Sequence, residues 1–415
     1  MSIDGPAKPQ GPEELTRRRT LHVKIKDLVR KKRQVTAEGP NSMRVAVIGL
    51  GGTGSAALRF LAQAGHEAIG YEQFRVGHTR GSSHGESRII RYAYPDPLYT
   101  NLMGHAYPLW DDLERQAGQE LFVRCGGLFI DREGSETLTQ VVGALAGAGL
   151  PHDFLTAGET RERYPAFHLD DGEVSLWQPE SGFLRASDCV RANIRLAVAA
   201  GAQLREDVRV MAIAARSQWG VLVSTEAREE IFERILVTAG PWIGKFLRDL
   251  HLPVTVTRQQ VVYAGIARNA ERFSSAQMPV WIDSGSPEFY YGIPADGRIP
   301  GIKLAMHRFG EEFDPDHADR PVSEAELAEA MAYARRRFPD ISGDVTYSTA
   351  CLYTVAPNED FLIDAVPGIP GAHFISGCSG HGFKFTVLLG RIGADLLLGD
   401  ADRWDLEAFR VTSSE

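Results

Sequence analysis

Residues 43–72 read MRVAVIGLGGTGSAALRFLAQAGHEAIGYE, and this stretch decides the fold. A short β-branched run at 45–48 predicts a buried strand. Residues 56–64 predict a helix, and Gly65 is a natural stop signal at its C-terminal end. A second short strand then leads to Glu72. Strand, loop, helix and strand follow one another as they do in a βαβ unit.

Three glycines between the first strand and the helix, Gly49, Gly51 and Gly54, have G-x-G-x-x-G spacing. One makes a tight turn, one lets the backbone approach a pyrophosphate, and one lets helix pack on strand. The helix N-terminus offers free N–H groups to that pyrophosphate. Glu72 would accept hydrogen bonds from ribose hydroxyls. The stretch predicts dinucleotide binding; the alternative is a glycine-rich loop that merely packs tightly.

Composition narrows the class of protein. A chain of 415 residues is long enough for two domains, and 43% hydrophobic with 24% charged residues is ordinary for a soluble globular protein. The net charge of −9 argues against general binding to nucleic acid or anionic membranes. The four cysteines show no C-x-x-C pair and no zinc spacing, which predicts no metal site and a reducing, cytoplasmic location. No apolar run approaches the length that spans a bilayer.

The first 42 residues differ from the rest, with ten Lys or Arg against five Asp or Glu. RRR at 17–19 and RKKR at 30–33 could form a nuclear or nucleic-acid signal, or an amphipathic surface helix. We favour a disordered basic extension. The segment has no apolar h-region, so a secretory signal is not expected.

Two arginines follow the dinucleotide unit, in RGSSHGESRIIRYAYP at 80–95. Arg88 and Arg91 are three residues apart, so on a helical turn they would share one face. Two guanidinium groups so placed can hold a carboxylate or a flavin oxygen. The alternative is a solvated pair. Further helices are predicted at 103–118 and 137–149, and within 182–201, where Ser187 or Asp188 is the expected cap.

The central part of the chain changes character. Residues 203–213 and 220–225 alternate like strands, and RILVTAGPW at 234–242 reads as an apolar strand that passes close to a cofactor. Residues 253–349 contain strands of antiparallel type separated by turns. A helix at 322–338 is predicted to begin with a capping box of Ser323 and Glu326.

The last informative stretch is HFISGCSGHGFKFTVLLGRIGADLLLG at 373–399. A glycine-rich turn precedes an apolar helix that carries Gly390, Gly393 and Ala394, so the helix can pack very close to a sheet. Its N-terminus could point at the N1/C2 oxygen region of a flavin ring. An NAD enzyme has no need of such a returning loop, so this stretch favours FAD.

Several motifs together resemble one family: RGSSHGESRIIRYAYP, YYGIP, GIKLAMH, ACLYTVAPNEDFLID and SGHGFKF. From Met43 almost to the C-terminus the chain resembles the monomeric sarcosine oxidase and N-methyltryptophan oxidase family, which are amine-oxidising flavoproteins of the D-amino-acid oxidase superfamily. The resemblance implies FAD attached by an 8α-S-cysteinyl thioether to Cys351 of ACLYT. Taken alone, Cys351 would be read as an inert buried thiol.

The resemblance also implies roles for individual residues. Arg91 and Lys384 match the residues that bind the substrate carboxylate, and Arg88 and His84 match residues beside the flavin ring. Lys303 matches the lysine that activates oxygen, where a fixed ammonium stabilises developing negative charge. The amine pocket is matched by His307, Tyr291 and Tyr353, and further cofactor contacts by Val210, Gly380 and Gly382. Variable positions at Cys378, Met306 and Trp281 leave the substrate open.

The implied reaction oxidises a secondary, often N-methylated, amino acid to an imine that water hydrolyses, while oxygen becomes hydrogen peroxide. No carboxylate stands among the matched residues, so the substrate would react as the neutral amine. The expected partners are this small molecule and oxygen, and the expected state is a monomer. Alternatives are a fructosyl-amino-acid or pipecolate oxidase, an NAD-dependent Rossmann dehydrogenase, and a dinucleotide-binding regulator without turnover.

The expected fold class is α/β, with a Rossmann-type FAD-binding domain interleaved with an α+β substrate domain on a largely antiparallel sheet. The FAD-binding domain is predicted to comprise 43–125, 182–252 and 350–415. The substrate domain is predicted to comprise 126–181 and 253–349.

Overall fold

The computed structural model describes residues 42–217 and 220–411. Residues Met43–Glu415 form one compact unit. The predicted basic extension at 1–42 lies almost wholly outside the described residues. Within the two described ranges, no helix is both long and apolar enough to cross a membrane.

A six-stranded sheet holds the opening βαβ stretch, with strand order β19-β20-β13-β1-β2-β9. Its central strand β1 pairs in parallel with β2 and β13, and only the edge strand β19 runs antiparallel to its neighbour. The strands are β1 (Arg44–Ile48), β2 (Glu67–Tyr71), β9 (Gln203–Arg205), β13 (Arg234–Val237), β19 (Leu362–Ala365) and β20 (Ala372–Ser376).

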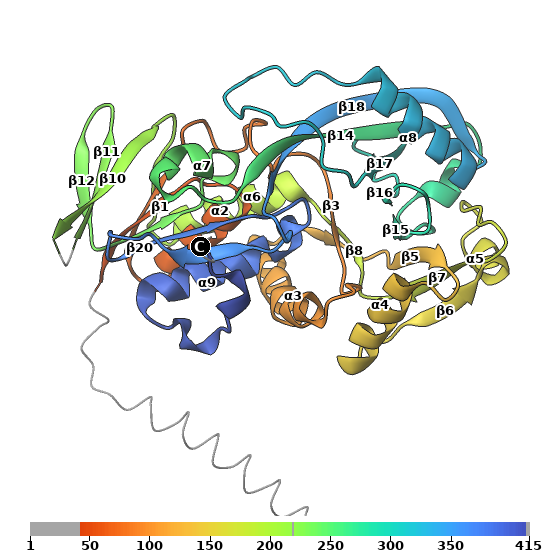
Figure 1. Cartoon of the computed structure of the whole chain (residues 1–415), viewed down its shortest axis with the longest axis horizontal. Helices are drawn as coiled ribbons and strands as arrows, with labels where there is room; N and C mark the ends of the chain where they lie inside the picture. The colour runs from red at the N-terminus through yellow and green to blue at the C-terminus, as the bar shows by residue number, and fades with distance from the viewer. Residues whose placement is uncertain (1–41, 218–219, 412–415) are drawn as a thin grey trace, which may run out of the picture. The chain divides into compact units, whose positions relative to one another are not determined.

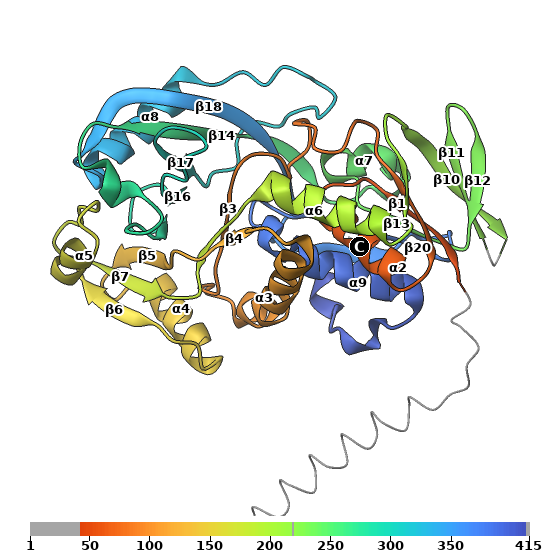
Figure 2. The same cartoon turned by 180° about the vertical axis from the view of Figure 1, so that it is seen from behind.

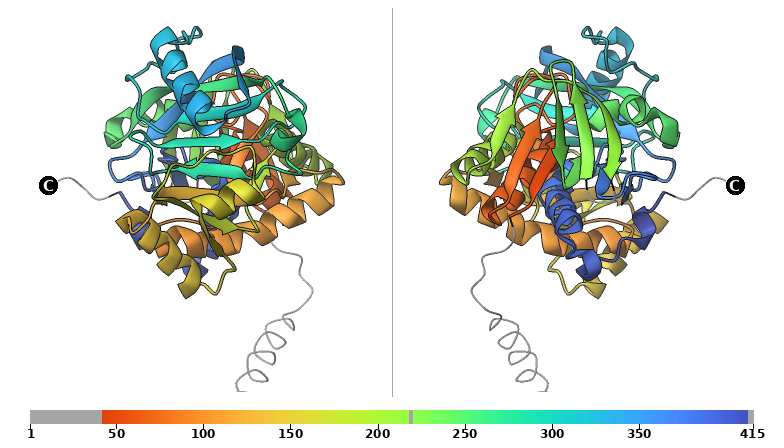
Figure 3. Two further views of the ribbon diagram at one scale, coloured as in Figure 1. Left: turned by 90° about the vertical axis from the view of Figure 1, so that its right-hand side faces the viewer. Right: turned by 90° about the vertical axis from the view of Figure 1, so that its left-hand side faces the viewer.

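The two faces of this sheet are covered differently, and alternate residues of β1 show it. Val45 and Val47 pack into the core formed with the helices α2 (Gly52–Gln63), α3 (Pro97–Ala117), α6 (Ala186–Ala199) and α9 (Thr386–Leu398). Ala46 and Ile48 pack against the small antiparallel sheet β10 (Val210–Ser217), β11 (Gly220–Thr225) and β12 (Glu229–Phe232). Figure 2 shows α2 and α6 side by side, and the right-hand view of Figure 3 shows the green strands β10–β12 near the orange β1.

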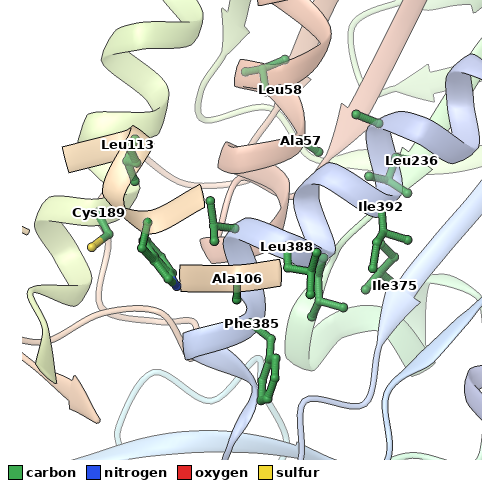
Figure 4. Packing of buried hydrophobic residues seen from close by; sticks show 14 of the residues in the cluster. Ala57, Leu58, Ala106, Leu113, Cys189, Leu236, Ile375, Phe385, Leu388 and Ile392 are labelled. Carbon is green, nitrogen blue, oxygen red and sulfur yellow. The ribbon is translucent and has the colours of Figure 1, made fainter. Parts of the chain in front are cut away.

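Helix α9 lies very close to the sheet through Gly393, as its glycines predict, and equally close to α2 through Gly390. A Cβ on Gly390 would stand 2.5 Å from the Cβ of Ala56, and a Cβ on Gly393 would stand 2.5 Å from Leu236. Figure 4 shows the resulting cluster, in which Leu388 and Ile392 of α9 meet side chains from the neighbouring helices and strands.

An eight-stranded sheet forms the other half, with strand order β18-β14-β17-β16-β15-β5-β7-β6 (Figure 1). All its pairs are antiparallel except β15 with β5. The strands are β5 (Gly127–Arg132), β6 (Asp153–Thr156), β7 (Glu173–Gln178), β14 (Thr255–Ile266), β15 (Val280–Asp283), β16 (Tyr290–Ile293), β17 (Ile302–Met306) and β18 (Ile341–Val355). Strand β18 runs through position 350, where the sequence places a domain boundary, and the division into domains stays a prediction.

The remaining elements surround these sheets. Helix α8 (Glu324–Arg337) covers one face of the large sheet, while α4 (Glu136–Gly147) and α5 (Ala157–Arg163) flank its far end. A three-stranded sheet of β3 (Arg88–Ile90), β8 (Gly182–Leu184) and β4 (Phe122–Val123) lies where the chain passes between the two large sheets. The short helices α7 (Ile243–Phe246) and η4 (Gly382–Phe385) border the site described below.

Two local predictions are wrong. Arg88 lies in strand β3 rather than on a helical turn, so Arg88 and Arg91 do not share a helical face. Helix α6 begins after Arg185 without a side-chain cap, because the Ser187 hydroxyl bonds the backbone N–H and C=O of Gly85 instead.

The predicted capping box of α8 is half formed. The Ser323 side chain accepts a hydrogen bond from the Glu326 N–H at 3.4 Å. The Glu326 carboxylate accepts from Arg258 at 3.1 Å. A long-range ion pair therefore takes the place of the reciprocal bond that the local pattern predicts.

Candidate active site

A deep cleft of about 250 Å³ opens where the carboxyl ends of β1, β2 and β13 meet strand β18 of the large sheet. This edge of a parallel sheet is where ligands bind in open α/β folds. Most lining residues fall within the segments 48–53, 71–84, 208–211, 238–246, 351–354 and 375–386. We call the glycine-rich end of the cleft, at β1, the nucleotide end. We call the end at β18, where the flavin ring is expected, the ring end.

Two of the three glycines of the nucleotide end, Gly49 and Gly54, stand where any side chain would collide with backbone. A Cβ on Gly49, whose φ is +95°, would lie 2.5 Å from the Thr238 carbonyl oxygen. A Cβ on Gly54 would lie 1.8 Å from the carbonyl oxygen of Gly49, so this glycine lets α2 pack on β1. Gly51 caps α2 without any side-chain bond and lines the cleft. The N-terminus of α2 therefore faces the cleft in the position of a phosphate site, and its Gly52 N–H donates to Ser83 Oγ at 2.9 Å.

Glu72 follows β2 and lines the cleft, with 5% of its surface exposed. One carboxylate oxygen accepts from the Leu50 N–H at 2.9 Å and the other from the Phe74 N–H at 3.2 Å. These two bonds fix the carboxylate beside the glycine loop. The oxygen bonded by Phe74 also lies 3.4 Å from His78 Nε2, while the oxygen bonded by Leu50 keeps capacity for a further bond, which suits the predicted ribose contact.

Three cleft-lining residues carry buried polar atoms that lack a hydrogen-bond partner within the described residues: Thr354 Oγ1, Ser376 Oγ and His84 Nε2. Buried polar atoms in native proteins are normally hydrogen-bonded, so such atoms indicate a missing polar ligand. Together with the glycine turn and Glu72, they fit a bound dinucleotide.

Three more predicted cofactor contacts also line the cleft. Val210 begins strand β10 and is buried. A Cβ on Gly380 would lie 2.2 Å from the Tyr353 ring, and one on Gly382 would lie 2.5 Å from Cys378. The chain therefore passes the ring end with no room for side chains at these two glycines.

Strand β18 supplies two residues of the ring end. Cys351 and Tyr353 are two apart, so both point to the face that lines the cleft, and each is less than 10% exposed. The Tyr353 hydroxyl lies 3.3 Å from that of Tyr291 in β16. The predicted pocket tyrosines are therefore adjacent.

His84 lies on the loop before β3, and Arg88 is the first residue of that strand. The Arg88 guanidinium donates to the carbonyl oxygens of Ser82, His84 and Ser87 at 2.8–3.0 Å. Burial, and then the charge of Arg88, lower the pKa of His84 to about 3, so His84 is neutral at physiological pH.

Lys303 of β17 stands directly behind this loop. Its Nζ donates to the Ser87 carbonyl oxygen at 2.6 Å, and only 5% of the residue is exposed. Burial, followed by repulsion from Arg88, lowers the pKa of Lys303 to about 7. A buried ammonium with such a pKa and no carboxylate contact is typical of a functional group.

Arg91 and Lys384 come together around Tyr94, and Lys384 follows Gly382 and Phe383 of η4, which line the ring end. Both lie against the side chain of Tyr94, at 3.9 Å from the ring for Arg91 and 2.9 Å from the hydroxyl for Lys384. Neither cation contacts a carboxylate anywhere in the described part of the chain. Burial and then Arg91 hold the pKa of Lys384 well below its usual range.

His307 follows β17 at the outer side of the ring end. Its ring centroid lies 6.0 Å from that of Tyr353 and 6.5 Å from that of Tyr291. Its Nε2 lies 3.8 Å from the carboxylate of Glu359. The predicted pocket residues thus form one aromatic group.

Sequence reasoning missed four residues of this region: Ser87, Tyr94, Glu359 and His381. All of them lie inside the motifs that carry the family resemblance, which is a signal that could have drawn attention to them.

Trp281 lies elsewhere, in the core of the large sheet, where its Nε1 donates to Tyr333 at 3.1 Å. Within the described ranges, no group of three or more His, Cys, Asp or Glu could hold a metal ion.

Residues 44–396 match the family described as FAD dependent oxidoreductase. The chain belongs to this family. Its sequence is 34% identical to the monomeric sarcosine oxidase of Streptomyces avermitilis, over 85% of this chain and 93% of that protein. It is 30% identical to human peroxisomal sarcosine oxidase, over 88% and 95% of the two chains, and 31% identical to an N-methyl-L-tryptophan oxidase of Yersinia pestis, over 88% and 97%.

Solved structures agree on the fold. The open form of NikD, an amino acid oxidase of nikkomycin biosynthesis, superposes with a TM-score of 0.77 at 22% identity, over 89% of this chain and 97% of that one. L-proline dehydrogenase from P. horikoshii also gives 0.77, at 20% identity over the same shares. The predicted family and fold class are confirmed. This protein is an FAD-dependent oxidoreductase, which removes the NAD-dependent alternative.

Proposed function

We propose that this protein is an oxidase of secondary, N-methylated amino acids that passes the electrons to oxygen and forms hydrogen peroxide. The observation that carries the proposal is the pair of cations Arg91 and Lys384, which stand beside the ring end of the cleft and have no carboxylate partner among residues 42–217 and 220–411. A buried cation pair of this kind is costly unless an anion completes it. The carboxylate of an amino acid is an anion of the right size and charge.

Bound FAD would supply the redox chemistry: it would accept two electrons from the C–N bond of the substrate and pass them on to oxygen. The chain holds the dinucleotide through the glycine turn of Gly49 and Gly51, the N-terminus of α2 and the carboxylate of Glu72. At the ring end, Cys351 is the proposed point of attachment, through a thioether between its Sγ and the 8α carbon of the flavin. The position of Cys351 on the cleft-lining face of β18 supports this attachment.

Two groups of the substrate, its carboxylate and its amine, are bound at different places and so fix its orientation. Arg91 and Lys384 bind the carboxylate, and each charge-assisted hydrogen bond contributes about 1.5–3 kcal/mol. Tyr291, Tyr353 and His307 surround the amine. The cations of the ring end favour the neutral amine over the ammonium, which leaves the nitrogen lone pair available for oxidation.

Lys303 serves the second half of the reaction. Negative charge develops on oxygen when it takes electrons, and a fixed ammonium nearby stabilises that charge. Its bond to the Ser87 carbonyl holds Nζ in one place beside the loop that carries His84 and leads into Arg88. We also propose that the oxidase acts in the cytoplasm, as its cysteine pattern predicts, and as a monomer, as the family resemblance implies.

The test is an oxygen-uptake screen of the purified holoenzyme over N-methyl amino acids, cyclic imino acids and fructosyl-amino acids. We expect uptake, with stoichiometric hydrogen peroxide, for N-methyl amino acids above all. Faster turnover of pipecolate or of a fructosyl-amino acid would transfer the assignment to one of the sibling oxidases. A yellow enzyme that consumes no oxygen with any of these amines would contradict the proposal.

A further inference from the structure

Tyr94 lies between the two cations of the proposed carboxylate site, three residues after Arg91 in the segment RYAYP. Its side chain is buried, with 6% of the residue exposed. The Arg91 guanidinium carbon lies 3.9 Å from the ring centroid, in the position of a cation–π contact. On its other side, the hydroxyl accepts a hydrogen bond from Lys384 Nζ at 2.9 Å. One side chain therefore touches both cations.

The direction of the hydroxyl follows from its third neighbour, His381. Nε2 of His381 lies 2.9 Å from the Glu359 carbonyl oxygen, which can only accept, so Nε2 carries the proton. Burial, and then Lys384, lower the pKa of His381 to about 3, so the imidazole is neutral and Nδ1 is an acceptor. The Tyr94 hydroxyl, 3.2 Å from Nδ1, donates to it and turns its oxygen lone pairs to Lys384.

Aromatic rings keep the imidazole of His381 in this orientation. Phe361 stacks on it with centroids 5.4 Å apart and planes 18° apart. Tyr99 meets it edge-on at 5.0 Å. The imidazole is therefore fixed by two hydrogen bonds and by ring contacts that also include Tyr94 and Phe385, and it acts as a rigid acceptor for Tyr94.

The ammonium of Lys384 keeps one free donor in this arrangement. Of its three N–H groups, one bonds the Tyr94 hydroxyl and one the His381 carbonyl oxygen at 2.7 Å. Arg91 has no hydrogen bond and no ion pair to any residue in the described ranges, and its Nη1 is buried without a partner. Both cations thus keep donors for a ligand, and Tyr94 is what they share.

We propose that Tyr94 is the positioning residue of the carboxylate site: its ring holds the Arg91 guanidinium, its hydroxyl holds the Lys384 ammonium, and His381 fixes the direction of that hydroxyl. The inference rests on the proposed function, because it takes Arg91 and Lys384 as the groups that bind the substrate carboxylate. It also gives Tyr94 a role in substrate selectivity. The spacing of the two cations decides how well the enzyme distinguishes an amino acid from an amine without a carboxylate.

The experiment compares Tyr94→Phe, Tyr94→Leu and the control Tyr99→Phe in the holoenzyme. Tyr99 is a suitable control because its ring packs on Tyr94 at 5.3 Å, while its hydroxyl bonds Asp360 and touches neither cation. Two quantities are measured: the dissociation constant of a small carboxylate that has no amine, from the change in flavin absorbance, and KM for an N-methyl amino acid and for its carboxamide.

Tyr94→Phe loses one contact and should weaken carboxylate binding about fivefold. Tyr94→Leu loses both contacts and should weaken it about twentyfold. KM for the carboxamide, and all constants of Tyr99→Phe, should change by less than about twofold. Equal effects on carboxylate and carboxamide would overturn the inference, because they would indicate general damage to the pocket.

A pH profile separates positioning from simple packing. The Tyr94 hydroxyl stabilises the charged form of Lys384, so its loss lowers the pKa of Lys384 further. Carboxylate binding should therefore fail at a lower pH in Tyr94→Phe than in the natural enzyme. His381→Leu, which removes the acceptor, should weaken binding in the same way, whereas His381→Asn keeps an acceptor near the hydroxyl and should restore most of the affinity.

Two further variants distinguish this inference from the proposed function. If Arg91→Met and Lys384→Met bind the small carboxylate as the natural enzyme does, the carboxylate site itself is wrong. If they bind it weakly while Tyr94→Phe keeps both its affinity and its pH profile, only the role of Tyr94 is wrong.

Discussion

The two ends of the cleft are built on different principles. The nucleotide end is made mostly of backbone: a glycine turn and the N-terminus of α2, joined by the Glu72 carboxylate of the same segment 49–72 and by Ser83, whose Oγ accepts from the Gly52 N–H. The ring end is made of side chains from β3, β17, β18 and η4, which lie far apart in the sequence. The first end depends on the absence of atoms at its glycines, and the second depends on particular functional groups.

Their charges differ as well. Lys245 lies at the nucleotide end and is 40% exposed, and it pairs with Asp314 and Asp316, whose hydrogen bonds outweigh burial and raise its pKa. At the ring end, Lys303 and Lys384 are buried and have no carboxylate partner in the part of the chain that the structure describes, and burial lowers the pKa of both. Exposed ion pairs of the first kind contribute only about 0–1 kcal/mol each to stability. Buried cations of the second kind, with strongly shifted pKa values, are typical of functional sites.

The strongest test of this contrast uses two thiols that line the same cleft. Cys351→Ser should abolish covalent attachment, so that acid precipitation releases all the flavin into the supernatant. Cys378→Ser should leave the flavin in the pellet, because its thiol faces the Gly382 turn instead of extending from β18. The measurement is flavin absorbance in pellet and supernatant. Flavin that stays in the pellet of Cys351→Ser would place the attachment elsewhere.

A second test removes one charge from the ring end. Lys303→Met should slow reoxidation of the reduced enzyme by oxygen about a hundredfold, equivalent to about 2.7 kcal/mol, because the ammonium no longer stabilises negative charge on oxygen. Anaerobic reduction by substrate should change much less. Stopped-flow absorbance follows the two half-reactions separately. Slower reduction with unchanged reoxidation would make Lys303 a substrate-binding residue.

At the nucleotide end, the addition of a single methyl group should lower the stability of the protein. Gly54→Ala would place a Cβ 1.8 Å from the Gly49 carbonyl oxygen and 2.5 Å from Thr238 Oγ1, so α2 must move away from β1. We expect a loss of about 2 kcal/mol in stability. Gly143→Ala is the matched control, since this exposed glycine of α4 has nothing within 4 Å of its Cβ position and should gain about 0.5–1 kcal/mol. Urea unfolding of both holoenzymes provides the comparison.

The same contrast explains how far the sequence could predict the molecule. The βαβ unit was readable because its signals lie within thirty residues and follow fixed spacings. The family motifs led to Arg91 and Lys384 but gave no geometry, and the helical spacing inferred for Arg88 and Arg91 failed because β3 pairs with β8, a strand about 95 residues away. The role of Tyr94 depends on His381, almost 290 residues later, and no local pattern contains such a contact.

The smallest expected effect concerns pH and again separates the two ends. Burial and Arg88 lower the pKa of Lys303 to about 7, while Cys351, Asp296 and Glu86 oppose that shift. The protonated lysine is the form that assists oxygen, so reoxidation should be fast below this pKa and slow above it. If the unprotonated enzyme reacts about a hundredfold more slowly, as Lys303→Met should, the rate of reoxidation should fall about ninefold over the two pH units centred on the midpoint. Negative charge on the reduced cofactor favours the ammonium, so the midpoint should lie at about pH 7 or higher. The Lys303→Met enzyme should show no such fall, because its ring end then lacks the titrating group. A pH dependence that persists unchanged in Lys303→Met would assign the titration to another residue.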